Sequence, residues 1–366
     1  MAEPRPLIER VTARAFRIPT DAPEADGTFA WRDTTLVVAK VEAGGETGIG
    51  YTYGAKVCAA FAANTLGETI RGQDAVDIPL CHRMMVNRVR NVGRSGVAAN
   101  AISAVDAALW DWKAKLFGVP LAALLGRARN AVPIYGSGGF TSYDDRRLAS
   151  QLTGWVEKDG CHAVKMKIGS HPDDDLRRVR VAKKAIAEAS LFVDANGAYS
   201  VKEALRLADL FAAQASVAWF EEPVSSDDLD GLAQVRAAAP AAMDIAAGEY
   251  AYNADDIRRM LMRRAVDVQQ ADASRCLGIT GFLQAAALCD AHHIDLSGHC
   301  APALHLHPAS AVPRLRHLEW FHDHVRIEHM LFDGAPVPKG GAIAPDMSRP
   351  GLGLVFKERD AERFAA

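Results

Sequence analysis

From about Ala131 onward, short apolar runs alternate with helical stretches of similar length. Short apolar runs bounded by turn signals are typical of buried strands, and helices between them indicate strand–helix units. Eight such units favour a closed β/α barrel over a doubly wound open sheet, and no Gly-x-Gly-x-x-Gly follows a predicted strand to support dinucleotide binding. The predicted strands are Val132–Ser137, Ala163–Ile168, Leu191–Asp194, Trp219–Glu221, Ile245–Ala247, Val266–Gln269, Asp295–Ser297 and His317–Glu319.

The chain before this repeat has a mixed pattern. Thr34–Gly44 and the GETGIGYTYG stretch that follows predict a β-hairpin with glycines at its turn. Helical periodicity then predicts a long helix over Gly96–Phe117, which Gly118-Val119-Pro120 ends. We therefore expect an α+β region ahead of the barrel. The other predicted helices are Lys56–Arg71, Ile78–Val89 and Pro120–Gly126, with Asp173–Ala189 and Val201–Ala213 inside the barrel repeat.

The composition is that of an ordinary globular chain: 366 residues, 49% hydrophobic and 24% charged, with a formal net charge of −3. This balance gives no reason to expect nucleic acid or an anionic membrane as a partner. No stretch is apolar for the length of a membrane span, and the first residues do not resemble a signal peptide. The six cysteines are scattered without a Cys-x-x-Cys pair, so we expect reduced thiols in a cytoplasmic enzyme.

Two lysines, Lys165 and Lys167, alternate with apolar residues in the stretch VKMKIG. Period-two alternation places both on one face of a strand. On a surface strand that face would be solvated. In a barrel both ammonium groups would point inward, where like charges at close range disfavour full protonation, so one lysine could accept a proton near neutral pH.

Polar residues recur at the ends of successive predicted strands, where barrel enzymes place their chemistry. After Lys167 they follow at intervals of 20 to 28 residues, each close to one strand–helix unit. Seven residues in phase with the repeat are hard to assign to solvated loops, so we interpret them as one site. The members beyond Lys167 are Asp194, Glu221, Glu249, Asp272, His299 and Glu319.

Asp194, Glu221 and Glu249 come from three consecutive units. Taken singly, each could cap the helix that follows it. As a set, three converging carboxylates would repel one another without a cation, and hard oxygen ligands with room for water and substrate suit Mg²⁺. We therefore predict a magnesium site, with Glu222 outside the ligand set, either beside the ligands or on the surface, because Pro223 turns the chain there.

His299 and Asp272 lie on adjacent units. An aspartate that accepts a hydrogen bond from one imidazole nitrogen makes the other nitrogen a better base. Glu319, near the eighth strand, is either a salt-bridge partner or, beside an anionic substrate, a protonated donor to a developing oxyanion. A nucleophilic His299–Cys300 pair is disfavoured, because adjacent side chains usually point apart.

These motifs together resemble the enolase superfamily and, within it, the mandelate racemase group. The long helix of the family's capping domain, together with the residues that end it, resembles the stretch AISAVDAALWDWKAKLFGVPLAALLG. The barrel motifs then follow in the family's order: Lys-x-Lys, DANGAYS, WFEEP and AGE. The Asp272–His299 pair separates this group from the muconate lactonising and dipeptide epimerase group, which has a lysine on the sixth strand. The resemblance covers nearly the whole chain.

The resemblance implies a modified (β/α)7–8 barrel with an α+β capping domain. It divides the chain into a capping region at 1–128, a barrel at 129–324 and a C-terminal segment at 325–366 that returns to the cap. Loops near Thr20–Trp31 and Tyr51–Tyr53 would close over the barrel mouth. A homo-oligomer is also implied, because the family often forms dimers or octamers.

The same resemblance implies that Mg²⁺ binds the three carboxylates and assists removal of the proton α to a substrate carboxylate. Lys167 would be the base on one face of the substrate and His299 the acid or base on the other. Lys165 would neutralise the substrate carboxylate and lower the proton affinity of Lys167. Glu319 would hydrogen-bond the enediolate intermediate.

Two reactions share this residue set, both with a small-molecule carboxylate as partner. An acid-sugar dehydratase would use His299 to protonate a departing β-hydroxyl and yield a 2-keto-3-deoxy acid. We favour it because dehydration is the commoner activity of the group and because the polar segment Thr20–Asp33 suits a polyhydroxy chain. A racemase or epimerase of a mandelate-like 2-hydroxy acid would return a proton on the far face. The Asp272–His299 pair disfavours a lactonising enzyme, and the intact residue set disfavours a non-catalytic barrel.

Overall fold

Eight parallel strands form a closed barrel in the computed structural model, which describes residues 5–366. Each strand pairs with the next in chain order, and β11 pairs with β4 to close the ring. The predicted β/α barrel is confirmed. Its strands are β4 (Val132–Gly138), β5 (Ala163–Lys167), β6 (Ser190–Asp194), β7 (Val217–Glu221), β8 (Asp244–Ala247), β9 (Val268–Ala271), β10 (Asp295–Gly298) and β11 (Leu315–Phe321).

One predicted barrel strand is displaced as a whole. It was expected at Val266–Gln269 and lies two residues later, at Val268–Ala271. The side chain of Asp267 gives the reason: its carboxylate accepts the Ile245 backbone N–H and pairs with Arg236. The chain at this point is therefore anchored to its neighbours by a side chain before the strand ladder begins.

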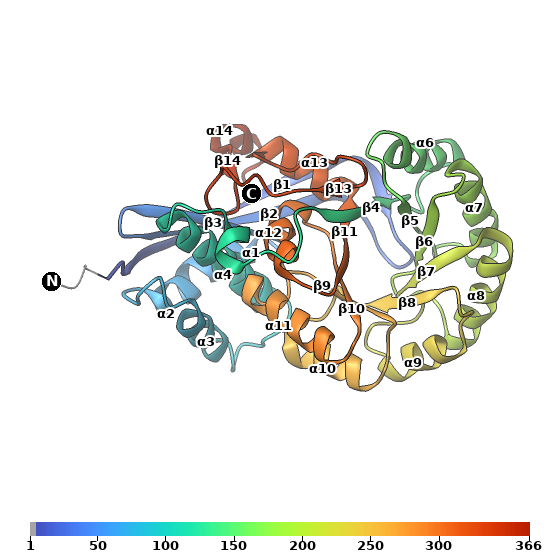
Figure 1. Ribbon diagram of the computed structural model, residues 1–366, viewed down its shortest axis with the longest axis horizontal. Helices are drawn as coiled ribbons and strands as arrows, with labels where there is room; N and C mark the ends of the chain where they lie inside the picture. The colour runs from blue at the N-terminus through green and yellow to red at the C-terminus, as the bar shows by residue number, and fades with distance from the viewer. Residues whose placement is uncertain (1–4) are drawn as a thin grey trace.

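A helix follows each barrel strand and covers the outside of the ring (Figure 1). Several begin at a side chain that accepts a free backbone N–H: Asp144 accepts from Arg147, and Ser200 accepts from Glu203. Their apolar faces pack on outward-pointing strand residues such as Val164. The helices are α6 (Asp145–Glu157), α7 (Pro172–Ala185), α8 (Val201–Ala215), α9 (Leu229–Ala238), α10 (Ala254–Met262), α11 (Gly278–Ala291), α12 (Pro302–Ala311) and α13 (His322–Leu331).

The inward-pointing side chains of the barrel form two layers. At the floor, Tyr135, Phe192, Trp219 and Val268 belong to one buried cluster, and His317 packs against its aromatic rings. Two residues further along several of these strands, the same face carries charged groups, because side chains alternate across a strand. The apolar floor therefore closes the barrel directly beneath the candidate site.

The predicted hairpin is part of a three-stranded antiparallel sheet in the cap, made of β1 (Ile8–Ala25), β2 (Ala30–Ala43) and β3 (Glu46–Tyr53). The sheet packs closely on the long helix α4 (Val97–Leu116): a Cβ at Gly48 would lie 2.1 Å from the Ala108 carbonyl oxygen, so only glycine fits there. The other cap helices are α1 (Val57–Phe61), η1 (Ala62–Gly67), α2 (Glu68–Ile70), α3 (Ile78–Arg88) and α5 (Leu121–Leu125).

The two segments expected as loops over the barrel mouth are largely strands. Most of Thr20–Trp31 forms the far end of the β1–β2 hairpin, whose turn spans residues 26–29, and Tyr51–Tyr53 belongs to β3. The β1–β2 pairing resumes at Glu24 opposite Trp31 after an irregularity that follows Pro19. Pairing within this hairpin keeps the segment extended.

The hairpin nevertheless reaches the barrel, as its path from the cap to the ring shows (Figure 1). Its tip sits against the ends of β5 and β6: a Cβ on Gly27 would lie 2.2 Å from the Ala195 carbonyl oxygen and 2.7 Å from that of Ile168. The Thr141 and Ser170 hydroxyls both donate to the Asp26 carbonyl. The expected closure over the mouth is thus made by a strand hairpin.

The C-terminal segment returns to the cap (Figure 1). β12 (Phe332–Asp333) pairs with β14 (Val355–Phe356), while β13 (Ala342–Ile343) pairs with barrel strand β4. After α14 (Glu358–Ala361) and η2 (Glu362–Phe364), the Ala366 N–H donates to the Ala15 carbonyl of β1. The domain limits 1–128, 129–324 and 325–366 stay predictions. Within residues 5–366, every helix is too short or too polar to span a bilayer.

Candidate active site

Both lysines of β5 point into the barrel. Lys165 is fully buried and Lys167 is 5% exposed, which excludes a solvated surface strand. The Lys165 ammonium lies 2.5 Å from Glu221 Oε1 and 2.8 Å from Glu319 Oε1. The Lys167 ammonium lies 2.5 Å from Asp194 Oδ2. The two cations therefore sit in a cluster of acids that come from the ends of other strands.

The charge state of these lysines differs from the expectation. Burial lowers the pKa of each, and Lys165 contributes a lowering of the Lys167 pKa in the expected direction. The carboxylates outweigh both effects: Glu221 and Glu319 raise the pKa of Lys165 well above its ordinary value, and Asp194 raises that of Lys167. In this arrangement both lysines are ion-paired ammonium groups, and the role of either one as a base stays a prediction.

The structure brings Asp194, Glu221 and Glu249 together, with one oxygen of each within 4.8 Å of the others. Asp194 and Glu221 end β6 and β7, Glu249 follows β8, and all three are buried. Burial and the Asp194 charge raise the pKa of Glu221 to about 8, as crowded acids require. Within the described chain Glu249 Oε2 has no hydrogen-bond partner. Three hard oxygen donors with a free lone pair fit Mg²⁺.

The alternative that these carboxylates cap helices is wrong. The helices α8, α9 and α10 are capped instead by Ser200, Asp228 and Asn253. Glu222 is not a surface residue either, since it is 1% exposed. Burial and the neighbouring Glu249 raise the pKa of Glu222 well above its ordinary value. Of the two placements considered for Glu222, only the one beside the ligands remains.

His299 and Asp272 form the expected pair. Asp272 Oδ2 lies 2.8 Å from His299 Nδ1, which leaves Nε2 as the free imidazole nitrogen, 3.3 Å from Glu249 Oε2. Burial lowers the pKa of His299, but the Glu249 and Glu319 carboxylates and the hydrogen bond to Asp272 outweigh it and raise that pKa well above its ordinary value. The pair therefore presents a protonated imidazole, which is an acid, to the carboxylate cluster.

Glu319 is an ionised salt-bridge partner. Its Oε1 accepts a hydrogen bond from Ser137 Oγ at 2.5 Å and pairs with Lys165, while its Oε2 accepts the Cys300 backbone N–H at 3.0 Å. Burial raises the pKa of Glu319, but Lys165 and His299 lower it well below its ordinary value. This arrangement favours the salt-bridge alternative, and a protonated donor beside an anionic substrate stays a prediction. Ser137 was missed, although it ends a predicted strand in phase with the other site residues.

Cys300 lies against His299, so the expectation that the two side chains point apart is wrong. Its Sγ is 3.2 Å from His299 Nε2 and 3.4 Å from Glu319 Oε2. Cys300 and Ala301 have φ values of 51° and 39°, a left-handed turn that folds the thiol back over the imidazole. Burial and Glu319 raise the pKa of the thiol to about 12, so the pair does not supply a nucleophilic thiolate.

The other buried histidines near the site act as neutral acceptors. His305 Nε2 accepts the Ala273 backbone N–H, and His324 Nδ1 accepts the Ala301 N–H. Burial lowers the pKa of both. The His324 ring also stacks on Tyr53, with ring centroids 3.5 Å apart. The histidine-rich segment at 321–329 therefore borders the site and supports the turn at Ala301.

The β1–β2 hairpin roofs the site with aromatic contacts. Trp31 packs edge-on against Phe140 at 5.5 Å, and Phe140 packs edge-on against Phe321 at 5.8 Å. These rings, Cys300 and Tyr143 form one buried cluster. An aromatic wall therefore leads from the thiol beside His299 up to the hairpin.

Glu24 is the charged group on the inner face of this roof. It lies opposite Trp31, is 1% exposed, and its Oε2 accepts the Trp31 indole N–H at 2.8 Å. In the part of the chain that the structure describes, its Oε1 has no partner. Burial and then Asp323 raise the pKa of Glu24 to about 8, so the carboxyl is largely protonated at neutral pH. The polar character of the segment was noted, but Glu24 was not singled out.

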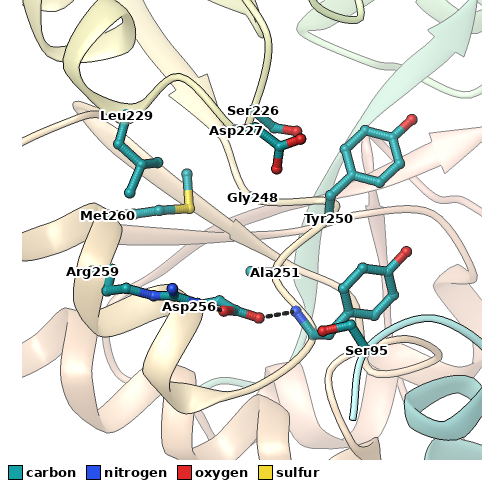
Figure 2. A pocket seen from close by; sticks show the side chains of 11 residues that line it. Ser95, Ser226, Asp227, Leu229, Gly248, Tyr250, Ala251, Asp256, Arg259 and Met260 are labelled. Atoms are coloured by element: carbon teal, nitrogen blue, oxygen red, sulfur yellow. Dashed lines mark hydrogen bonds and ion pairs between the residues drawn. The ribbon is translucent and has the colours of Figure 1, made fainter. Parts of the chain in front are cut away.

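A cavity of about 570 Å³ opens beside the buried cluster of lysines and carboxylates (Figure 2). The loops after β7 and β8 line it through Ser226, Asp227 and Tyr250, and Ser95 comes from the cap. Figure 2 shows the nearby Asp256 carboxylate with a backbone N–H donated to it. Tyr250 directly follows the candidate ligand Glu249, yet none of the predicted site residues lines the cavity. We therefore assign the chemistry to the buried cluster.

Two family models match the chain. Residues 11–126 match the N-terminal domain of the mandelate racemase and muconate lactonizing enzyme family. Residues 147–361 match the enolase C-terminal domain-like family. The two matches span the cap and the barrel in the order that the structure places them.

Similar proteins cover nearly the full chain. A 3,6-anhydro-alpha-L-galactonate cycloisomerase of Streptomyces coelicolor is 32% identical over 98% of both chains. A solved mandelate racemase/muconate lactonizing enzyme-like protein from Rubrobacter xylanophilus is 48% identical with a TM-score of 0.96, over 99% of this chain and 100% of that one. L-talarate/galactarate dehydratase from Salmonella typhimurium, solved with Mg and L-lyxarohydroxamate, is 30% identical with a TM-score of 0.90, over 100% of this chain and 94% of that one.

Proposed function

We propose a function that starts from the family: the chain belongs to the enolase superfamily, in the mandelate racemase and muconate lactonizing enzyme family. The proposed reaction is removal of the proton α to a carboxylate, followed by loss of the β-hydroxyl of a sugar acid. The observation that carries it is the placement of Lys167 and the Asp272–His299 pair around three buried carboxylates. Removal of so weakly acidic a proton needs a base, hydrogen-bond donors and a cation together.

We propose that Asp194, Glu221 and Glu249 hold Mg²⁺. The bound ion supplies electrostatic stabilisation of a dianionic enediolate, and its charge offsets the Asp194 charge that otherwise holds the Lys167 proton. The support is the fit of the oxygen donors to the ion. Magnesium in the solved talarate/galactarate dehydratase is consistent with this proposal.

The protein's own residues divide the proton transfers between them. Lys167 takes the α-proton, and Lys165 holds a fixed positive charge where the substrate carboxylate becomes more negative. His299, kept protonated by its acidic neighbours, donates its Nε2 proton to the β-hydroxyl. The carbon–oxygen bond breaks, its electron pair leaves with the oxygen as water, and the enol that remains becomes a 2-keto-3-deoxy acid. Asp272 orients the imidazole throughout.

We further propose that the substrate is a sugar acid with a single carboxylate. The roof presents the Glu24 carboxyl, whose Oε1 is free. The nearby Arg147 and Arg326 already pair with Asp21 and Asp323. Because both guanidinium groups are already paired with carboxylates, neither is free to pair with a second carboxylate at the far end of a diacid, which disfavours a diacid substrate. A terminal hydroxyl is neutral and can both donate to and accept from the protonated carboxyl.

A racemase or epimerase is the second candidate function. The observation that favours it is that Lys167 and His299 reach the site from β5 and from the end of β10, which lie on different sides of the barrel. If the substrate offers no β-hydroxyl in reach of His299, the same imidazole can return a proton to the α-carbon on the face away from Lys167. The outcome is then inversion without loss of water.

Proton NMR in D₂O with Mg²⁺ tests these proposals against gluconate, arabinonate, rhamnonate, galactarate, talarate and mandelate. A 3-deoxy signal that grows on a monoacid supports the dehydratase and its substrate class. The same signal on diacids alone contradicts the single-carboxylate proposal and leaves the dehydratase. Deuterium at the α-carbon without loss of water favours the racemase. No change in any compound contradicts both functions.

Two further expectations are carried forward as proposals. We propose a cytoplasmic enzyme, which is supported by six buried cysteines, all of them free within residues 5–366. We propose a homo-oligomer from the family resemblance alone. Light scattering of the purified protein measures its mass directly, and a mass of 39.3 kDa would contradict the oligomer.

A further inference from the structure

We propose that His299, Cys300 and Glu319 form a second cation site, selective for a thiophilic metal such as Zn²⁺, and that its occupation blocks the enzyme. The binding part of this proposal stands on geometry alone. The blocking part rests on the proposed role of His299 in proton transfer. The site adjoins the three carboxylates proposed for Mg²⁺, since His299 Nε2 lies 3.3 Å from Glu249 Oε2, but it uses a different donor set.

The three donor atoms lie at the corners of a small triangle. Cys300 Sγ is 3.2 Å from His299 Nε2 and 3.4 Å from Glu319 Oε2, and the nitrogen is 3.7 Å from that oxygen. In a tetrahedral zinc site the bond lengths to sulfur, nitrogen and oxygen place such donors about 3.4–3.6 Å apart. The observed separations scatter around that range, so one ion can contact all three donors with little movement.

The donors are held in place largely through other atoms, and Glu319 Oε2, which accepts the Cys300 backbone N–H, keeps a second lone pair. Asp272 fixes His299 through Nδ1 at 2.8 Å and so directs Nε2 into the triangle. Ser137 and Lys165 hold Glu319 by Oε1, which leaves Oε2 on the side of the thiol. An outer partner that orients a ligating imidazole or carboxylate is a regular feature of protein metal sites.

The backbone turn makes Cys300 the third donor. Its φ of 51°, followed by 39° at Ala301, is a conformation that non-glycine residues rarely adopt, and it brings the thiol over the imidazole nitrogen. All three side chains are buried, at 4%, 4% and 1% exposure. The strained turn therefore belongs to the same feature as the donor triangle.

The donor chemistry separates this site from the magnesium site. A thiolate and an imidazole prefer zinc and similar borderline metals, whereas Mg²⁺ prefers oxygen ligands alone. Binding of the metal would release the Cys300 thiol proton and the His299 Nε2 proton to solvent. Three protein ligands leave a fourth position on zinc for water or for a substrate oxygen. Because the ion would occupy Nε2 of His299, it would remove the group proposed to protonate the leaving hydroxyl.

A cobalt titration of the intact protein, with Mg²⁺ in excess, tests the binding part without any substrate. The wild type is expected to develop a thiolate-to-cobalt charge-transfer band that Zn²⁺ removes by competition. A wild-type spectrum with no such band overturns the proposal, and this outcome does not depend on whether any variant folds. The readout is also independent of the proposed reaction.

Cys300→Ser and Cys161→Ser then locate the ion, since Cys161 is a buried cysteine near the start of β5, at the other end of the barrel. The band is expected to persist in Cys161→Ser and to vanish in Cys300→Ser. Zn²⁺ affinity, measured by competition with cobalt, is expected to fall about tenfold or more in Cys300→Ser, since even an outer partner of a ligand costs that much. A band that persists in Cys300→Ser overturns the assignment.

Zn²⁺ inhibition of turnover, each variant being compared with its own zinc-free rate, tests the blocking part. The inhibition constant is expected to rise about tenfold or more in Cys300→Ser, in step with the lost affinity. Equal inhibition of wild type and Cys300→Ser overturns the blocking part, because the ion then acts at the three carboxylates. If the enzyme has no activity on any sugar acid, the proposed function is contradicted. The metal site is then tested by the cobalt titration alone.

Discussion

The floor of the barrel and the site above it are formed by residues two positions apart on the same strands. They differ in polarity and in the contacts that hold them. Phe192 precedes Asp194 on β6, and Trp219 precedes Glu221 on β7, each pair on one face of its strand. The lower member of each pair packs in an apolar cluster, and the upper member is paired with a lysine. A single strand register thus sets a packed layer directly beneath a charged one.

The comparison shows how a buried charge cluster is supported. Trp219 links the two layers, since its indole N–H donates to Glu221 Oε2 at 2.9 Å. The packed floor keeps the surroundings of Lys165 and its partners at low dielectric, where charges act strongly on one another. Buried charges cost stability unless they are paired, so the upper layer is expected to contribute chemistry and the lower layer stability.

The largest effect expected is on turnover. Lys167→Ala removes the proposed base and should lower kcat about 10²–10⁴-fold, the usual contribution of general base catalysis. Lys202→Ala, at an exposed position on α8, is the matched control and should leave kcat unchanged. Steady-state assays on the substrate found by NMR measure both. A wild-type rate in Lys167→Ala would contradict the catalytic role assigned to the upper layer.

A mutation in the floor should change the free energy of unfolding. Trp219→Ala empties a fully buried ring site and should lower the free energy of unfolding by about 3–5 kcal/mol. Glu221→Gln, two residues later, keeps the volume, relieves the repulsion between Glu221 and Asp194 and leaves Lys165 paired with Glu319, so its loss should be smaller. Urea titrations followed by circular dichroism compare the two. If the charge variant is the less stable one, the division of labour between the layers is wrong.

Metal binding should stabilise the upper layer. At a Mg²⁺ concentration about 100 times its Kd, the native state should gain about 2.7 kcal/mol. Glu249→Gln removes one proposed ligand and should reduce the Tm shift caused by Mg²⁺, whereas Asp227→Asn, at an exposed position in the neighbouring cavity, should keep it. Thermal scans with Mg²⁺ and with a chelator provide the measurement. Equal shifts in both variants would place the ion elsewhere.

A pH dependence of stability is also expected at the roof. Burial and Asp323 raise the folded-state pKa of Glu24 to about 8 from an ordinary 4.5, so between these values the folded protein keeps a proton that the unfolded chain has lost. Stability should therefore fall as pH rises through this window, by at most about 1.4 kcal/mol per pH unit, and level off above it.

Glu24→Gln is the control for that slope, because the amide has the same shape and does not titrate. Its Tm should vary less with pH than that of the wild type across the same window, with the two curves closest at the acidic end. Parallel curves would show that another group sets the pH dependence. Glu328, whose pKa burial raises to about 8, is the group to test next.

The sequence was sufficient for the barrel because its signal is repeated. Each unit ends an apolar run with a polar residue, and the strand ends of a barrel must meet at one rim, so phase alone brought Asp194 and Glu221 to one place. The same logic gave the Asp272–His299 contact. Ser137 carried the same signal and was overlooked, because a serine at a strand end is less unusual than a charge.

The remaining features depend on contacts that local pattern does not encode. The path of β1 is fixed by pairing with β2, and the position of Glu24 opposite Trp31 follows an irregularity in that pairing which the sequence pattern does not signal. The turn at Cys300 uses a positive φ at a residue that is not glycine, which no sequence rule signals. The charge of Lys167 depends strongly on its ion pair with Asp194 at 2.5 Å. The sequence does not give that distance.

The most direct test of the central claim follows an α-deuterium label on the identified substrate in water containing Mg²⁺. His299→Asn should still wash the label out, because Lys167 remains, while it forms no 2-keto-3-deoxy product. Lys167→Ala should retain the label. This separation of proton removal from dehydration is what a base and an acid on different strands predict. Label loss in Lys167→Ala, or full product formation by His299→Asn, would contradict the account.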